Sequence, residues 1–224
     1  NRHTTNVIVD DRALYEIYLP AFKAAVQKGK AWAIMGSYNL YKNQHNCHNR
    51  YLLNDILKGE WGFDGVVVSD WGGVHNTEEA IYNGMDMEFG SWTNGLSKGM
   101  GNAYDNYYLA HPYLKQIKEG KIGTKELDDK VRRILRLAFR TTMNRNRPYG
   151  AMLSEEHIAA ARKIGEEGIV LLQNKKNILP IDLNRTKKIA VIGENALKMM
   201  TVGGGSSSLK VQYECSPLDG IKRR

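Results

Sequence analysis

Apolar positions recur at helical spacing in several stretches of the first 140 residues. In the earliest stretch, residues 13–22, Asp10 or Asp11 is the expected N-cap and Pro20 predicts a kink or a break. Short apolar runs predict strands at 31–35, 65–69 and 85–89. Further helices are expected over 52–57, 77–82, 107–118 and from 124 onward, with loops over 36–49 and 90–106. This alternation of strands and helices is typical of an α/β fold with a parallel sheet.

A carboxylate stands directly after one of these buried runs. Asp70 follows the strand predicted at 65–69, and Trp71 and two glycines come next. The carboxyl ends of parallel strands form the edge at which α/β folds place their chemistry. An aromatic ring beside a carboxylate suits a sugar pocket. From spacing alone, however, Asp70 is equally well interpreted as the cap of the next helix.

The pattern changes after residue 140. Residues 141–153 are polar and contain both Pro and Gly, so we interpret them as a linker between domains. Ser154 then opens a predicted helix that has two glutamates in its first turn. Strands are expected at 169–173 and 188–192, and a flexible loop at 203–208.

Composition and charge exclude some classes of partner. The chain has 224 residues, 42% hydrophobic and 25% charged, as in ordinary globular proteins. No apolar run approaches the ~20 residues that span a bilayer, so no membrane partner is expected. The net charge is +8, but the basic residues are dispersed among 24 acidic ones, so no nucleic-acid partner is expected. The chain lacks an initial Met and a signal segment, so we expect it to begin inside a longer protein.

Two local motifs hint at bound groups. Cys47 lies in the run HNCH at 45–48, which suggests a metal cluster. The paired spacings of zinc sites are absent, so a loop with chance His and Cys neighbours is the better interpretation, and no metal is expected. Gly203–Gly205 follow a predicted strand, but they match neither the dinucleotide fingerprint nor the P-loop. No cofactor is therefore expected.

Longer motifs occur in one order along nearly the whole chain. They are ALYEIYLPAF (13–22), MGSYN (35–39), YLLNDILKGEWGFDGVVVSDW (51–71), NGMDME (83–88), VRRIL (131–135), GIVLLQN (168–174), LP (179–180), KKIAVIG (187–193) and GGGS (203–206). This series resembles the family 3 glycoside hydrolases. Trp71 after the aspartate is similar to the β-glucosidase type, whereas β-xylosidase-like members more often have Cys there.

The resemblance implies a fold that this chain covers in part. A complete (β/α) barrel needs ~250 residues. We therefore expect the C-terminal part of a TIM-like barrel over 1–140, the linker over 141–153 and the first part of an α/β sandwich domain over 154–224. In the family the active site lies between the two domains, and secretion or a periplasmic location is favoured.

The same resemblance implies roles for six residues. Asp70 matches the nucleophile of a retaining mechanism. Sugar contacts are implied for Arg2, Met35, Tyr38, Trp71 and Ser206. From the residues alone, Arg2 can also be a surface arginine, Met35 a core methionine and Trp71 a packing residue. Asp86 and Glu88 are expected to support the site rather than to form the catalytic pair.

The expected activity is that of a retaining, exo-acting β-glucosidase that releases terminal β-D-glucose from oligosaccharides or glucosides. A β-xylosidase, a broad-specificity exoglycosidase and a non-catalytic carbohydrate-binding relative stay open as alternatives. The family's general acid/base and several sugar-binding residues lie outside these 224 residues. The remaining part of the same enzyme is therefore an expected partner, and the chain alone is expected to be inactive.

Overall fold

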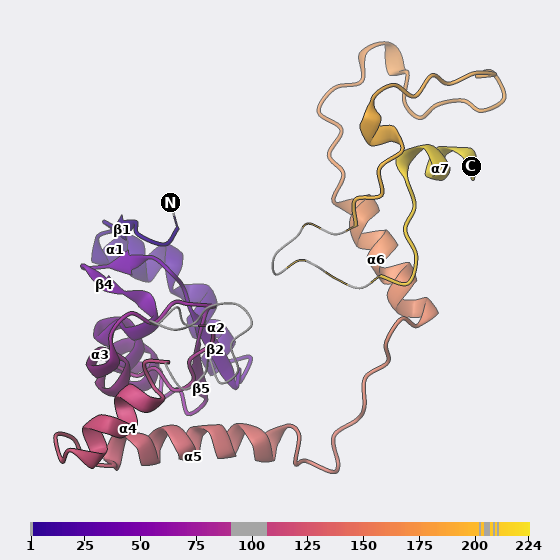
Figure 1. The fold of residues 1–224 in the computed structure, drawn as a ribbon. Helices are drawn as coiled ribbons and strands as arrows, with labels where there is room; N and C mark the ends of the chain where they lie inside the picture. Colours follow the sequence, from indigo (N-terminus) through magenta and orange to yellow (C-terminus); the bar gives the residue numbers. More distant parts are fainter. Residues whose placement is uncertain (1, 91–106, 202, 204–206, 208, 210) are drawn as a thin grey trace. The chain divides into compact units, whose positions relative to one another are not determined.

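The computed structural model describes residues 2–90, 107–201, 203, 207, 209 and 211–224 (Figure 1). The chain divides into two compact units, Asn1–Tyr149 and Gly150–Arg224, which are described separately. Among the described residues, no helix is long and apolar enough to cross a membrane.

The first unit opens with a broken helix. Asp10 caps α1 (Asp11–Ala13), since its side chain accepts a 2.7 Å hydrogen bond from the Ala13 N–H. A π-helical turn, Leu14–Tyr18, follows, and α2 (Pro20–Gln27) then begins at the proline. Proline lacks an N–H and is therefore tolerated in the first turn of a helix, where that group has no partner. The break predicted at Pro20 is confirmed.

The first unit contains a pair of parallel strands, labelled β2 and β5 in Figure 1. Strand β2 (Ala33–Gly36) pairs with β5 (Val66–Ser69) in register from Ala33 with Val66 to Gly36 with Ser69. The segment predicted as a strand at 85–89 runs beside β5, but it makes only one parallel bridge, between Val68 and Met87. The Asp86 and Met87 N–H groups both bond the Val67 carbonyl, which interrupts the regular ladder.

A small second sheet was not expected. Strand β1 (Asn6–Val7) pairs with β3 (Leu40–Tyr41), which forms a hairpin with β4 (Gln44–His45) inside the loop predicted at 36–49. The turn residues Lys42 and Asn43 have φ values of 52° and 62°. Such positive values are those of the tight turns that match the twist of a hairpin. The hairpin therefore depends on two residues in a left-handed conformation that the apolar pattern does not mark.

The core lies between β5 and the helices that follow β2 and β5. The helix predicted at 52–57 is longer and π-helical, Tyr51–Glu60, and α3 (Thr77–Tyr82) has the predicted bounds. Ile56, Val67 and Met85 are at most 2% exposed. Burial of apolar side chains of this size contributes about 1.5–3 kcal/mol each. This core holds β5 and the residues at its end in place.

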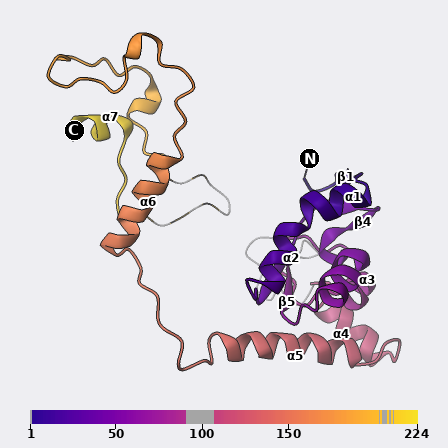
Figure 2. The same cartoon turned by 180° about the vertical axis from the view of Figure 1, so that it is seen from behind.

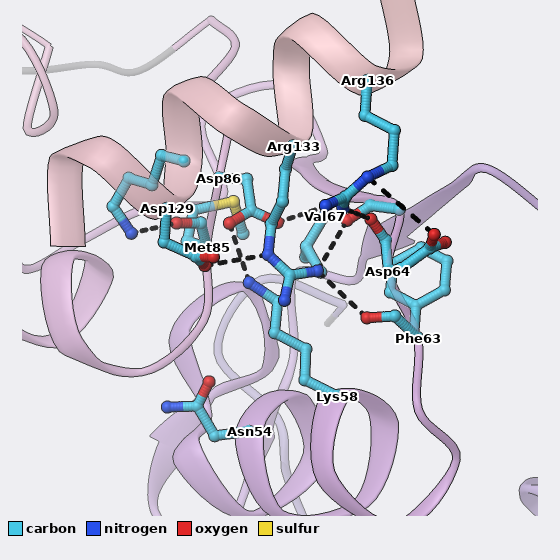
Figure 3. Close-up of polar contacts among 12 residues, drawn as sticks. Asn54, Lys58, Phe63, Asp64, Val67, Met85, Asp86, Asp129, Arg133 and Arg136 are labelled. Carbon is cyan, nitrogen blue, oxygen red and sulfur yellow. Dashed lines mark hydrogen bonds and ion pairs between the residues drawn. The ribbon is translucent and has the colours of Figure 1, made fainter. Parts of the chain in front are cut away.

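Helix α5 (Lys125–Arg140) follows α4 (His111–Lys118) and runs along the first unit in both views (Figures 1 and 2). Lysine and arginine side chains of α5 attach it to the rest of the first unit (Figure 3). The Lys130 ammonium group donates to the carbonyls of Ala80, Ile81 and Met85, and Arg133 donates to those of Phe63 and Gly65. These bonds satisfy carbonyls at the end of α3 and just before β5.

Beside them lies a buried ion pair between neighbouring elements (Figure 3). The Asp86 carboxylate is fully buried and lies 2.7 Å from the Lys58 ammonium group. Its other oxygen accepts a 2.8 Å bond from the N–H of Val67 in β5. The pair therefore joins the helix Tyr51–Glu60 to β5, the strand that Asp70 follows.

The second unit contains helices α6 (Glu155–Glu167) and α7 (Pro217–Lys222). Ser154 caps α6 as predicted, since its hydroxyl accepts from the His157 N–H. The strands predicted at 169–173 and 188–192 are wrong for this structure, in which these segments are irregular. Val170 is 75% and Leu172 92% exposed. A strand needs a neighbour for its backbone groups, and the described residues offer these segments none.

Candidate active site at the carboxyl end of β2 and β5

The predicted site residues of the first unit gather where β2 and β5 end. Because the strands are parallel, the residue after β5 and the loop after β2 meet at one edge of the sheet. The Asp70 N–H donates to the Gly36 carbonyl at 3.2 Å, which ties the two strand ends together. Tyr38 lies two residues beyond Gly36. The parallel pairing of β2 and β5 thus brings Asp70 and Tyr38 to the same edge.

Asp70 sits in a tight turn and does not cap the next helix. Its carboxylate accepts a 2.6 Å bond from the Trp71 N–H, and its carbonyl accepts from the Gly73 N–H at 3.0 Å. The cap of α3 is Asn76, whose side chain accepts from the Glu79 N–H at 3.0 Å. The interpretation of Asp70 as a helix cap is therefore wrong. Its carboxylate is held by the turn and stays at the strand edge.

Tyr38 connects the loop after β2 to this carboxylate. Its phenol lies close enough to the Asp70 carboxylate for the two groups to influence each other. Burial, and then the neighbouring Asp70, raise the pKa of Tyr38, so the hydroxyl keeps its proton. The Arg2 guanidinium lies 5.3 Å from the centre of the Tyr38 ring, and the His3 ring lies 4.4 Å away. Arg2 therefore lies near the candidate site, with an exposed side chain.

Two apolar side chains at this edge are open to solvent. Trp71 is 62% exposed and stacks on Phe89, with ring centres 6.1 Å apart. Gly90 packs so tightly on the indole that a Cβ there would overlap it. Met35 in β2 is 58% exposed, whereas its neighbour Ile34 packs on the core. The interpretation of Met35 as a core methionine is therefore wrong for this structure.

The acidic residues Asp86 and Glu88 are engaged by groups other than those of the Asp70 turn. Asp86 is engaged by Lys58 and Val67. Glu88 accepts from the N–H groups of Tyr108 and Leu109, at 3.1 and 2.7 Å. Burial nevertheless raises the pKa of Glu88 to about 7. Ser206 lies outside the described residues.

Cys47 is a neighbour of Asp70 that the sequence did not indicate. The thiol is fully buried and donates to the Ser37 carbonyl at 3.4 Å. A Cβ on Gly36 or on Gly73 would collide with Cys47, so these glycines permit the close packing below the turn. Burial raises the pKa of the Cys47 thiol to about 11. Among the described residues, no group of three or more His, Cys, Asp and Glu side chains is arranged to hold a metal ion.

Comparison with known proteins agrees with the sequence motifs. The glycosyl hydrolase family 3 N terminal domain matches residues 1–137, and the glycosyl hydrolase family 3 C-terminal domain matches residues 169–224. Beta-glucosidase BoGH3A of Bacteroides ovatus is 54% identical over 98% of this chain and 30% of its own length. A beta-glucosidase of Rhizobium radiobacter is 38% identical over 99% of this chain and 26% of its own length.

Solved structures of beta-glucosidases are also similar to this chain. Beta-glucosidase 3B from Thermotoga neapolitana, in complex with α-D-glucose, superimposes with a TM-score of 0.81 at 33% identity. The match covers all of this chain and 30% of that protein. The chain thus spans less than a third of the length of these relatives. Both domain models match in order and the first covers more than half of the residues, so the chain belongs to glycosyl hydrolase family 3.

Proposed function

We propose that this chain is part of a retaining, exo-acting β-glucosidase and that Asp70 is its nucleophile. The observation that carries the proposal is the placement of Asp70: it directly follows β5, lies near the Tyr38 phenol and is next to the exposed Trp71. The substrate is a terminal β-D-glucosyl unit of an oligosaccharide or glucoside. The names of the similar proteins support glucose as the sugar.

In this mechanism the Asp70 carboxylate attacks the anomeric carbon, and a covalent glycosyl–enzyme intermediate forms. The leaving oxygen takes a proton from a second carboxyl group ~5–5.5 Å from the first. Water then hydrolyses the intermediate, and the second carboxyl group acts as base. The Tyr38 hydroxyl stabilises the ionised carboxylate and directs its free oxygen towards the sugar.

We assign sugar contacts to the remaining residues at this edge. Arg2 has donors for ring hydroxyls, and Trp71 and Met35 offer apolar surface to the C–H faces of a sugar. Ser206 remains a proposal for an outer subsite. Glu88 has the raised pKa that an acid needs, but both its oxygens accept backbone N–H bonds. We therefore place the acid/base outside these residues.

The proposal includes the architecture of the whole enzyme. Residues 1–140 would complete the C-terminal part of a TIM-like barrel, 141–153 would link the domains, and 154–224 would begin an α/β sandwich. The exposed apolar side chains near Val170 and Leu172 support this arrangement, because such segments become stable when another part of the protein covers them. The remaining part of the same enzyme is thus a required partner, and the isolated chain is inactive.

Chemical rescue of a nucleophile variant tests the proposal. In the full-length protein, Asp70→Gly should abolish turnover of an aryl β-glucoside. Added azide should then restore release of the aryl group and give α-glucosyl azide, because a small anion enters the space of the carboxylate. Asp64→Gly is the matched control, since Asp64 pairs with Arg140 before β5 and should leave turnover in place. Full activity in Asp70→Gly would refute the assignment. A preference for aryl β-xyloside would favour the xylosidase alternative.

A further inference from the structure

The residues His45–Cys47 contact the loop that carries Tyr38. The His45 Nδ1 atom lies 3.0 Å from the Tyr38 carbonyl oxygen. The Asn46 N–H donates to the Asn39 carbonyl at 3.0 Å, and its side-chain amide donates to the Ser37 hydroxyl at 2.9 Å. The Cys47 thiol bonds the Ser37 carbonyl. Three consecutive residues thus hold the three residues of the loop 37–39.

The geometry fixes the proton on the His45 ring. A carbonyl oxygen can only accept, so the His45 Nδ1 atom carries the proton and donates it to Tyr38. The ring itself stacks on His75, with centres 3.9 Å apart and an angle of 26° between the planes. His45 therefore has a defined orientation and a defined tautomer.

His75, on which His45 stacks, is in turn held in place by His48. The backbone N–H of His75 donates to the Nε2 atom of His48 at 3.3 Å, so the proton of neutral His48 is on Nδ1. That atom lies 2.6 Å from the Glu79 carboxylate. His48 is 2% exposed. Burial, followed by the neighbouring rings of His45, His48 and His3, lowers the pKa of His75 to about 4, so this ring stays neutral and stacks without repulsion near neutral pH.

We propose that His45 is a positioning residue for the glycosidase reaction. Its imidazole fixes the Tyr38 backbone, so that the Tyr38 phenol meets the Asp70 carboxylate in the orientation needed for attack on the sugar. The inference rests on the function proposed above for Asp70. It gives the HNCH run a role in the site through hydrogen bonds rather than through a metal. A small displacement of a reacting group can reduce a rate by up to about a hundredfold.

The test compares His45→Ala with His45→Asn in the full-length protein. The Asn side-chain amide places a donor near the position of Nδ1, whereas Ala has none. Each variant is treated with a 2-deoxy-2-fluoro-β-glucosyl inactivator, which separates the inactivation rate constant from the inhibitor's dissociation constant. His45→Ala should lower the rate constant by about 10- to 100-fold and change the dissociation constant by less than about twofold. His45→Asn should restore most of the rate.

Two controls separate the donor from packing. His157→Ala removes an exposed histidine of α6 and should change nothing. His75→Phe keeps an aromatic ring on the His45 stack and should stay close to wild type, whereas His75→Ala should slow inactivation. Retained thermal unfolding midpoints confirm that the variants fold.

The outcomes distinguish the two proposals. Labelling of wild-type Asp70 with an unchanged rate in His45→Ala would overturn the role of His45 and leave the function intact. A His45→Asn variant as slow as His45→Ala would also overturn it, because the donor would then not matter. A wild-type protein with neither labelling nor turnover would overturn both proposals.

Discussion

The buried ion pair of Asp86 and Lys58 lends itself to a quantitative test through Asp86→Asn. The Asp86 side chain is 0% and the Lys58 side chain 11% exposed, so neither charge is screened by water. Asn keeps an acceptor for the Val67 N–H but leaves the Lys58 ammonium group unpaired. Breaking a buried pair by removing one partner costs about 3–5 kcal/mol. Val67 belongs to β5, the strand that Asp70 follows. We therefore expect the loss of stability to appear as local opening of this strand.

The assay is hydrogen–deuterium exchange of a peptide that covers residues 63–70 in the full-length protein. A loss of about 3–5 kcal/mol corresponds to exchange faster by two to more than three orders of magnitude. The double variant Lys58→Met with Asp86→Leu should exchange more slowly than Asp86→Asn, since it leaves no unpaired charge. Glu16→Gln breaks the exposed pair with Arg12 and is the control with little effect. A change below tenfold in Asp86→Asn would refute the reasoning.

Three further predictions follow from single contacts. Trp71→Ala should lower kcat/KM for an aryl β-glucoside by about tenfold, because the aromatic wall of the sugar site is lost. Trp32→Ala, just before the start of β2, should leave kcat/KM unchanged. Equal effects of the two substitutions would contradict the proposed sugar contact. Gly73→Ala should destabilise the protein by about 1–3 kcal/mol in urea unfolding, because the added Cβ overlaps Cys47. Adding Cys47→Ala to this variant should recover part of the loss. Unfolding free energies of the two single variants that simply add in the double variant would contradict this packing. Burial lowers the pKa of Lys130 to about 8 from 10.5, so between these pH values the unfolded chain binds a proton that the folded chain does not. The unfolding free energy should therefore rise with pH across this window, by roughly 3 kcal/mol relative to Lys130→Met, and equal slopes in the two proteins would contradict the assignment.

Local patterns predicted the parts of the fold that local forces decide. The Asp10 cap, the break at Pro20 and the bounds of α3 follow from a side-chain acceptor, a missing N–H and helical spacing. The apolar run before Asp70 predicted β5 within one residue. The pairing of β5 with β2 was then implied by strand–helix alternation.

Features that depend on distant partners were not predicted. The hairpin of β3 and β4 needs two left-handed residues, and no glycine marks them. The strands expected in the second unit have strand-like sequences, but the described residues give them no neighbour to pair with. The contact of His45 with Tyr38 spans seven residues across a turn, and the stack of His45 on His75 spans a strand and a helix. Spacing in the sequence contains no signal for either contact.

The central claim, that Asp70 is the nucleophile of a retaining β-glucosidase, is tested most directly by trapping the intermediate. The full-length protein is treated with a 2-deoxy-2-fluoro-β-glucosyl inactivator, and the labelled peptide is mapped by mass spectrometry. The account predicts one fluoroglucosyl group on the Asp70 carboxylate. A label on another carboxylate, or turnover of a β-glucoside with no label at all, would contradict it.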